Sequence, residues 1–217
     1  MSSPASGEVL TRGSLRRRAE KLARDHEVLA KAVEVGGWPK LWRRPLTFAT
    51  FIRVILEQQV SLASAWNTFD RLASRLGGGV TPDGVATIGQ EGLRSLGFSR
   101  QKARYADVFA DRCLSGEFKI ASLRRLSDAT VRERITAELG MGDWTADVIL
   151  MLALRRTDPF PTGDLALMKG LRMLTNRPEL TPDEAIAVAE PWRPYRAVAS
   201  RMIWAAYLNG KPIPGQN

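Results

Sequence analysis

The chain has 217 residues, of which 44% are hydrophobic, so it can bury a core and is not disordered as a whole. Its 32 basic and 23 acidic side chains give a net charge of +9, which favours a polyanionic partner such as nucleic acid or an anionic membrane surface. The single cysteine, Cys113, and the single histidine, His26, exclude an internal disulfide and a four-cysteine iron–sulfur cluster and argue against a multi-histidine metal site.

The sequence contains no stretch that could span a bilayer. Its longest wholly apolar run covers residues 148–154, whereas a membrane helix needs about 18 apolar residues. The N-terminal residues 1–9 are small and polar and lack the apolar core of a secretory signal. We therefore expect an intracellular protein, located in the cytoplasm or nucleoid if the source is bacterial.

The predicted elements are all helices. Apolar residues recur at helical spacing over residues 14–34, from 47 onward, and over 62–76, 101–114, 127–139, 143–154, 165–174, 182–189 and 195–208. Pro82 and Gly84 predict a break in the chain after the helix over residues 62–76. No strand alternation or βαβ rhythm is visible, so the predicted class is all-α, with about ten short helices and short connections.

The segment 138–146 carries two glycines, Gly140 and Gly142, between two predicted helices. Glycines at this spacing allow a tight turn and leave backbone N–H groups uncovered at the start of the next helix, which suits a phosphate oxygen. Phosphate contacts hold a protein on DNA without reading its sequence. The alternative is a purely structural turn between helices.

Asp164 follows two prolines and Gly163 and stands at the head of an apolar helix. A plain interpretation makes it the N-cap of that helix. The functional hypothesis is a carboxylate held at the mouth of a cleft between two lobes.

Gln59 lies where one helix gives way to a turn, and its side chain can cap that turn or form hydrogen bonds with base edges. The aromatic and arginine residues of 191–196, followed by Ile203 and Trp204, can stack on bases, although tryptophan at helical spacing is more often part of the core.

Together these segments resemble one family, the helix-hairpin-helix DNA glycosylases, and most closely the 3-methyladenine DNA glycosylase II branch. The resemblance runs from about Thr47 to Trp204, most of the chain. It is carried by residues 58–61, 96–99 with 102–103, 140–142 with 144–146, 160–161 with 164–165, and 192–196 with 203–204. Each match alone is weak, but five in the same order form a specific pattern.

The resemblance implies a fold and an organisation. The expected architecture is an all-α, two-lobed helical bundle containing a helix-hairpin-helix motif. The chain is treated as a single glycosylase unit over 1–217, with one lobe at 46–160 carrying the hairpin and the other formed by 1–45 plus 161–217. The implied partner is double-stranded DNA with a damaged base, bound by a monomer without a membrane and without a cofactor.

The resemblance also implies a chemistry. Asp164 matches the essential aspartate, which faces a base flipped out of the duplex and stabilises the cationic sugar while the N-glycosidic bond breaks. Members that also cleave the strand carry a nucleophilic lysine at the position of Trp144. Because Trp144 has no amine, we expect excision of alkylated bases without strand cleavage.

Further site residues follow from the same resemblance. The base pocket is expected to contain Trp144, Val148 and Leu165, of which the last two stand where branch members can carry aromatics, so substrate choice stays open. The residues expected to bind DNA are Gln58, Gln59, Ser61, Gly140, Gly142 and Thr145. No side-chain metal site is expected, although relatives can hold a monovalent cation on carbonyls matching Thr136, Glu138 and Met141.

Two rival hypotheses belong to other classes. A non-catalytic helix-hairpin-helix module would share the basic charge and the hairpin but would not need Asp164 or Gln59. A structural all-α protein on anionic membranes would use a basic amphipathic helix, for which residues 14–34 qualify, but it leaves the five matching segments unexplained.

Overall fold

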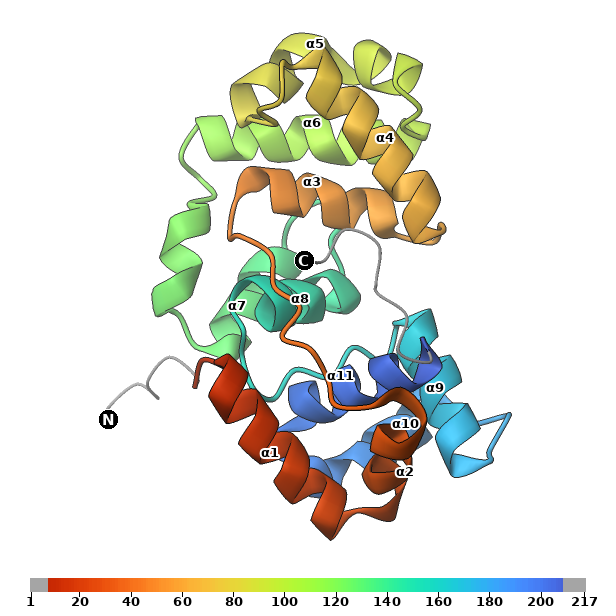
Figure 1. Ribbon diagram of the computed structural model, residues 1–217. Coiled ribbons are helices and arrows are strands. Elements are labelled where there is room, and N and C mark those ends of the chain that lie inside the picture. Colours follow the sequence, from red (N-terminus) through yellow and green to blue (C-terminus); the bar gives the residue numbers. More distant parts are fainter. Residues whose placement is uncertain (1–7, 209–217) are drawn as a thin grey trace. The chain divides into compact units, whose positions relative to one another are not determined.

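The computed structural model describes residues 8–208, and the regular elements within them are helices joined by loops (Figure 1). An isolated bridge between Val9 and Arg156 is the β feature of this part of the chain. The α-helices are α1 Arg12–Asp25, α2 Glu27–Gly36, α3 Phe48–Glu57, α4 Leu62–Arg75, α5 Pro82–Ser95, α6 Arg100–Leu114, α7 Asp128–Thr136, α8 Asp143–Val148, α9 Leu165–Thr175, α10 Pro182–Ala189 and α11 Arg196–Tyr207. Shorter helices are η1 Ile120–Arg125, the π-helix η2 Ile149–Ala153 and η3 Glu190–Trp192. The all-α class predicted from the sequence is confirmed.

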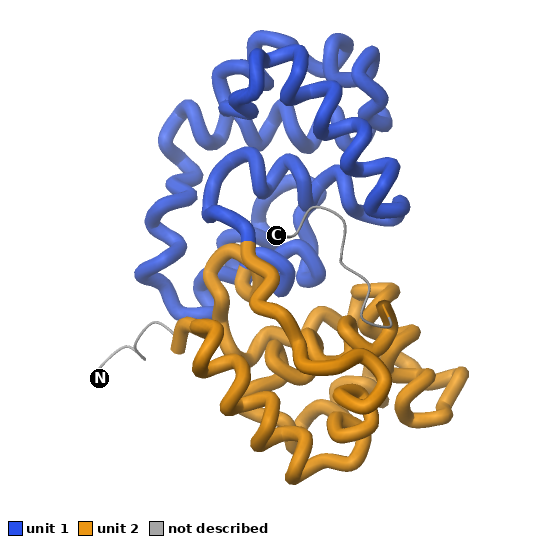
Figure 2. The backbone as a smooth tube through the Cα atoms, viewed as in Figure 1, with its two compact units in different colours: residues 1–6, 44–149 blue, residues 7–43, 150–217 orange. Residues whose placement is uncertain are grey.

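The helices form two compact units, drawn in different colours in Figure 2. Among the described residues, unit 1 comprises 44–149 and unit 2 comprises 8–43 together with 150–208. The units therefore divide after Arg43 and after Ile149, compared with 45 and 160 in the division made from the sequence. The second division falls after the first residue of η2, one residue beyond the end of α8.

Unit 1 is built from α3 to α8 around a cluster of phenylalanines. The ring of Phe109 lies 5.6 Å from Phe48, 5.0 Å from Phe51 and 5.1 Å from Phe118, measured between centroids. Beside this core, both nitrogens of the Arg44 fork bond the Glu57 carboxylate at 2.8 and 2.7 Å, and both side chains are buried. A buried charge is tolerated because the pair is bidentate.

Unit 2 is organised around α11, which packs against α1, α2 and α9. Every residue of α11 from Ala197 to Ala206 is buried. An all-buried helix must present small or apolar residues on every side, and its alanines at 197, 199, 205 and 206 meet that requirement. The result is a central helix against which α1, α2, α9 and η3 pack, whereas α10 packs on α9 and η3.

Two local predictions are wrong in detail. Residues 14–34 form two helices, because His26 adopts an extended conformation with φ −140° and ψ 113° and separates α1 from α2. Pro82 does not break the chain but begins α5, where Thr81 accepts a hydrogen bond from the N–H of Gly84 at 3.1 Å. Proline suits the first helical turn because its missing N–H has no partner there in any case.

No helix within residues 8–208 combines the length and the apolar character that crossing a bilayer requires.

Candidate functional site

The hairpin of unit 1 connects α7 to α8, and its turn depends on Gly140. This residue has φ +77°, a region that side chains strongly disfavour. A Cβ atom there would lie 2.2 Å from the ring of Tyr105, so the turn is also packed against α6. The N–H of Met141 donates to the carbonyl of Glu138 at 3.1 Å and closes the turn. The fold itself therefore requires glycine at 140.

Gly142 is different from Gly140. It is the N-cap residue of α8 with φ −99°, makes no side-chain cap, and is exposed. A Cβ atom built on Gly142 would meet no atom within 4 Å. Within unit 1, neither backbone conformation nor packing demands a glycine here. The missing side chain leaves room for another molecule to approach the backbone.

Gln58 connects the end of α3 to the hairpin. Its Nε2 donates to the carbonyl of Gly140 at 2.8 Å and to Oγ1 of Thr145 at 3.3 Å. Thr145 is buried, with 1% of its surface exposed. Three residues expected to bind DNA, Gln58, Gly140 and Thr145, are thus brought together, but Gln58 and Thr145 support the hairpin by contacts within unit 1.

The loop between α3 and α4 contains Gln59 and Ser61, two further residues that are expected to bind DNA. Gln59 has φ +55°, unusual for a residue with a side chain, and is exposed beside Val60, which is 45% exposed. Ser61 is the N-cap of α4 and accepts a hydrogen bond from the N–H of Ser64 at 3.2 Å. The loop therefore presents a glutamine in a strained conformation and an apolar side chain at the surface.

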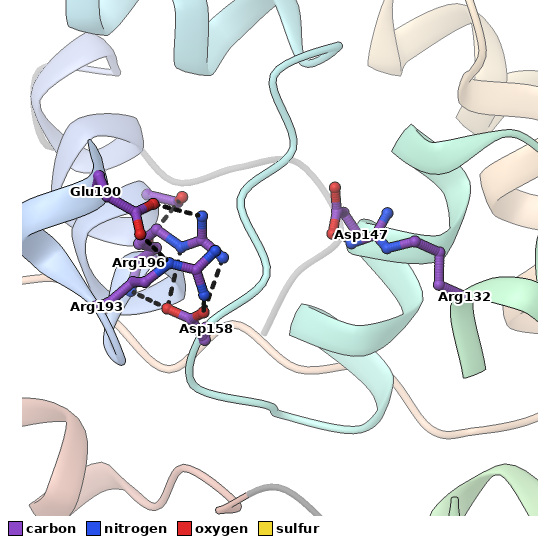
Figure 3. Close-up of polar contacts among 7 residues, drawn as sticks. Arg132, Asp147, Asp158, Glu190, Arg193 and Arg196 are labelled. Carbon is purple, nitrogen blue, oxygen red and sulfur yellow. Dashed lines mark hydrogen bonds and ion pairs between the residues drawn. The ribbon is translucent and has the colours of Figure 1, made fainter. Parts of the chain in front are cut away.

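Ion pairs hold α8 and the hairpin in place. Arg132 of α7 pairs with Asp147, which is buried in α8 (Figure 3). Arg132 also bonds Asp143 at 3.1 Å. Arg112 of α6 bonds the buried carboxylate of Glu138 through two nitrogens at 3.1 and 3.0 Å. Sequence reasoning did not single out these arginines, because their partners are reached across helices.

The predicted pocket residues of unit 1 differ in exposure. Trp144, the second residue of α8, is partly exposed, whereas Val148 at the end of that helix is only 4% exposed.

No cluster of three or more His, Cys, Asp or Glu side chains with metal-binding geometry occurs in the described part of the chain. Thr136 ends α7, and the Glu138 carbonyl already accepts the Met141 N–H, so the cation site on these carbonyls stays a prediction.

Cys113 is excluded as a nucleophile by its surroundings. Burial, with a smaller contribution from the charge of Glu138, raises the pKa of the Cys113 thiol to about 11. The thiolate is the reactive form, so the side chain stays protonated and unreactive near neutral pH. A carboxylate is therefore a stronger candidate than this thiol for the reactive group of the site.

In unit 2, Asp164 is the N-cap of α9. Its Oδ1 accepts the N–H of Leu167 at 2.8 Å, so the structural interpretation made from the sequence is confirmed. The same Oδ1 also accepts the indole N–H of Trp204 from α11 at 3.0 Å. A cap needs only the first of these bonds. The sequence predicts that Trp204 either stacks on a base or fills the core, and it does not predict the hydrogen bond to Asp164.

The loop that leads to Asp164 is held at its start by Asp158. This carboxylate bonds Nε and Nη2 of Arg196 at 3.0 and 2.8 Å and Nη1 of Arg193 at 2.7 Å, and Glu190 completes the group (Figure 3). The segment from 158 to 164 is therefore attached to the start of α11 at one end and to Trp204 at the other. Leu165, directly after Asp164, is 65% exposed, unusual for a leucine.

Comparison with known proteins identifies relatives. A family model described as HhH-GPD superfamily base excision DNA repair protein matches residues 52–194. DNA-3-methyladenine glycosylase 1 of Schizosaccharomyces pombe is 29% identical over 161 residues, which cover 72% of this chain and 71% of that protein. Two Bacillus subtilis relatives match at 27% and 24% identity, and the chain spans only 56% and 54% of their lengths.

Solved structures agree with the sequence comparisons. The structure of a 3-methyladenine DNA glycosylase from Schizosaccharomyces pombe in complex with abasic DNA has a TM-score of 0.80 and 26% identity, covering 87% of this chain and 95% of that one. A DNA-3-methyladenine glycosidase from Bacillus halodurans has a TM-score of 0.74 and 28% identity, with 88% of each chain covered.

Proposed function

This chain belongs to the HhH-GPD superfamily of base excision DNA repair proteins, and from that membership we propose that it is a monofunctional DNA glycosylase. Its proposed substrate is double-stranded DNA carrying an alkylated base of the 3-methyladenine type, bound by a monomer. The enzyme flips the damaged base out of the stack and hydrolyses its N-glycosidic bond. The products are a free base and an abasic site in an intact strand.

The observation that carries this proposal is Asp164. A half-buried carboxylate at the end of a loop, oriented by two hydrogen bonds on Oδ1, is suited to stabilise a positive charge. When the bond from sugar C1′ to the base nitrogen breaks, its electron pair leaves with the base and the sugar becomes a cation. Water then adds to C1′ and gives up a proton, and the carboxylate can accept it.

The alkylated base explains why no strong acid is needed. A purine alkylated on a ring nitrogen already carries a positive charge, so it takes the electron pair without receiving a proton from the enzyme. A normal base would leave only with the help of a general acid. The chemistry therefore requires one carboxylate, and it discriminates in favour of damaged bases before any pocket contact is considered.

The remaining residues are assigned to binding. We assign phosphate contacts to Gly140 and Gly142 and duplex contacts to Gln59 and Ser61, with Gln58 and Thr145 supporting the hairpin from inside unit 1. Trp144, Val148 and Leu165 are the proposed pocket residues. The exposed leucine supports its assignment, since an apolar side chain in water gains by covering a base.

Asp164→Asn tests the carboxylate. Asparagine keeps the shape, and its oxygen can still accept the two hydrogen bonds, but the negative charge is lost. We expect release of alkylated bases under single-turnover conditions to fall by roughly 10²–10⁴-fold, the effect of removing a positioned catalytic group, while affinity for abasic DNA changes little. Mass spectrometry of the bases released from methylated DNA measures the rate and names the substrate.

Asp183→Asn is the matched control, because Asp183 is an exposed acid in the first turn of α10 within the same unit. It should excise at the wild-type rate. Wild-type excision by Asp164→Asn would reduce Asp164 to a helix cap. DNA binding without base release by the wild-type protein would favour the non-catalytic module.

A further inference from the structure

Helix α11 touches the loop of Asp164 at both ends. At its start the N–H of Ala197 donates to the carbonyl of Thr157 at 3.0 Å, and Arg196 pairs with Asp158. Two helical turns later, the side chain of Trp204 bonds Asp164. Residues 196 and 204 are eight positions apart, so they lie on nearly the same face of the helix. The loop is thus aligned along one buried helix.

Two donors converge on a single oxygen of Asp164. The backbone N–H of Leu167 lies 2.8 Å from Oδ1, and Nε1 of Trp204 lies 3.0 Å from the same atom. The backbone donor comes from the helix that Asp164 caps, and the indole comes from another helix. One donor allows the carboxyl plane to pivot about the bond, whereas two donors from different directions fix its orientation.

Trp204 is itself held rigidly. It is only 6% exposed, and its ring lies 6.2 Å from the ring of Trp42 at an interplanar angle of 54°. The carbonyl of Trp42 accepts a hydrogen bond from Nη1 of Arg201 at 2.9 Å, and Nη2 of Arg201 donates to the carbonyl of Met151 at 2.7 Å. Arg201 therefore ties the segment before α3 and the η2 segment to α11.

The burial of Arg201 is costly. Its exposed fraction is 0%, and burial lowers its pKa to about 10. A guanidinium removed from water needs compensation, and here it bonds two carbonyls instead of a carboxylate, with Nε left without a hydrogen-bond partner. An apolar side chain at position 201 would be buried at a lower cost in free energy. We therefore infer that Arg201 serves to hold Trp42 in position, and that Trp42 in turn holds Trp204.

We propose that Trp204 is a positioning residue for Asp164, with its indole N–H orienting the carboxylate and with Trp42 and Arg201 holding the indole in place. This inference rests on the proposed function of Asp164. A carboxylate that is already oriented before the reaction stabilises the sugar cation without having to move. This avoided rearrangement accounts for most of the rate gain that such charged groups provide. The competing explanation is that a buried tryptophan merely satisfies its N–H.

Trp204→Phe tests the inference, because it removes the donor and keeps an aromatic ring. We expect the single-turnover rate of base release to fall about ten- to hundredfold, with the affinity for abasic DNA unchanged. Trp38→Phe is the matched control: Trp38 lies in the same unit, away from the loop of Asp164, and its ring packs under the guanidinium of Arg16, 3.9 Å from the ring centroid. It should keep its rate within about threefold.

A double-mutant cycle separates positioning from an independent contact with the base. On the Asp164→Asn background, Trp204→Phe should slow the reaction by less than about threefold, because there is no longer a charge to orient. Equal losses on both backgrounds, or a loss of DNA affinity instead of rate, would overturn the inference. If Asp164→Asn itself retains full activity, the proposed function fails, and that result is distinct from a failure of Trp204→Phe alone.

A shape-preserving variant covers the case in which phenylalanine destabilises unit 2. Site-specific incorporation of β-(3-benzothienyl)alanine at position 204 replaces the indole N–H by sulfur and keeps the bicyclic ring. The same fall in rate, with the melting temperature of the wild type, supports the inference. Full activity in this variant would show that the hydrogen bond has no part in the reaction.

Discussion

At the scale of single residues, the two hairpin glycines have different reasons to be glycine. Gly140 has a positive φ and lies against Tyr105, so its lack of a side chain is a requirement of folding. Gly142 has an ordinary φ and open space around it. From the sequence the two looked equivalent, since each could serve a turn or a phosphate contact. The backbone angles separate them and make Gly142 the cleaner test of DNA binding.

Gly142→Ala should leave the melting temperature unchanged and weaken binding to damaged and undamaged duplexes alike, because a phosphate contact carries no sequence information. The slope of log K against log salt concentration should become shallower by about one unit for each phosphate that the variant no longer binds. Fluorescence anisotropy titrations at several salt concentrations measure both. Unchanged affinity and slope would show that DNA is held elsewhere.

Gly140→Ala is the contrasting variant. A positive φ and a contact with a ring at 2.2 Å should destabilise the protein by about 2 kcal/mol or more, visible as a lower melting temperature. If Gly140→Ala melts as the wild type does, the assignment of this glycine to folding is wrong.

At the scale of elements, helices were predicted well where a cap and an apolar stripe agree. Residues 182–189 were predicted to be helical, and they form α10, where Thr181 and Glu184 make a capping box. Prediction failed at His26, which lies inside a continuous helical pattern but turns the chain so that α2 can pack on α11. The spacing of apolar residues along the chain carries no information on how α2 packs against α11, so the sequence pattern does not predict the break between α1 and α2.

The connection between α3 and the hairpin is also a property of elements. Gln58→Ala removes both hydrogen bonds and leaves the carbonyl of Gly140 without that donor, so we expect a lower melting temperature and weaker binding to every duplex. Thermal denaturation and anisotropy titrations measure the two effects. Gln101→Ala, at an exposed position of α6, is the control and should change neither. Wild-type behaviour of Gln58→Ala would mean that the hairpin keeps its shape unaided.

At the scale of the whole molecule, the net charge of +9 suits the double-stranded DNA that we propose as the partner. The nature of residue 144 decides the proposed reaction type. Because the hairpin offers tryptophan where an amine would be needed, borohydride reduction with abasic duplex should yield no strong covalent adduct. Gel electrophoresis detects the adduct, and a lyase that forms a Schiff base serves as positive control. A robust adduct would contradict the monofunctional proposal and direct attention to Lys169 of α9.

The sequence by itself determined the helical class, the order of the helices and the positions of Asp164 and the hairpin, since period, caps and glycine spacing are local properties. Only the tertiary structure decided which side chains meet. Trp204 reaches Asp164 across 40 positions, Gln58 reaches Gly140 across 82, and Arg201 reaches Trp42 across 159. Such pairs are selected by the packing of helices in each unit, and a hydrogen-bond donor in the sequence does not reveal which distant acceptor the packing will place beside it.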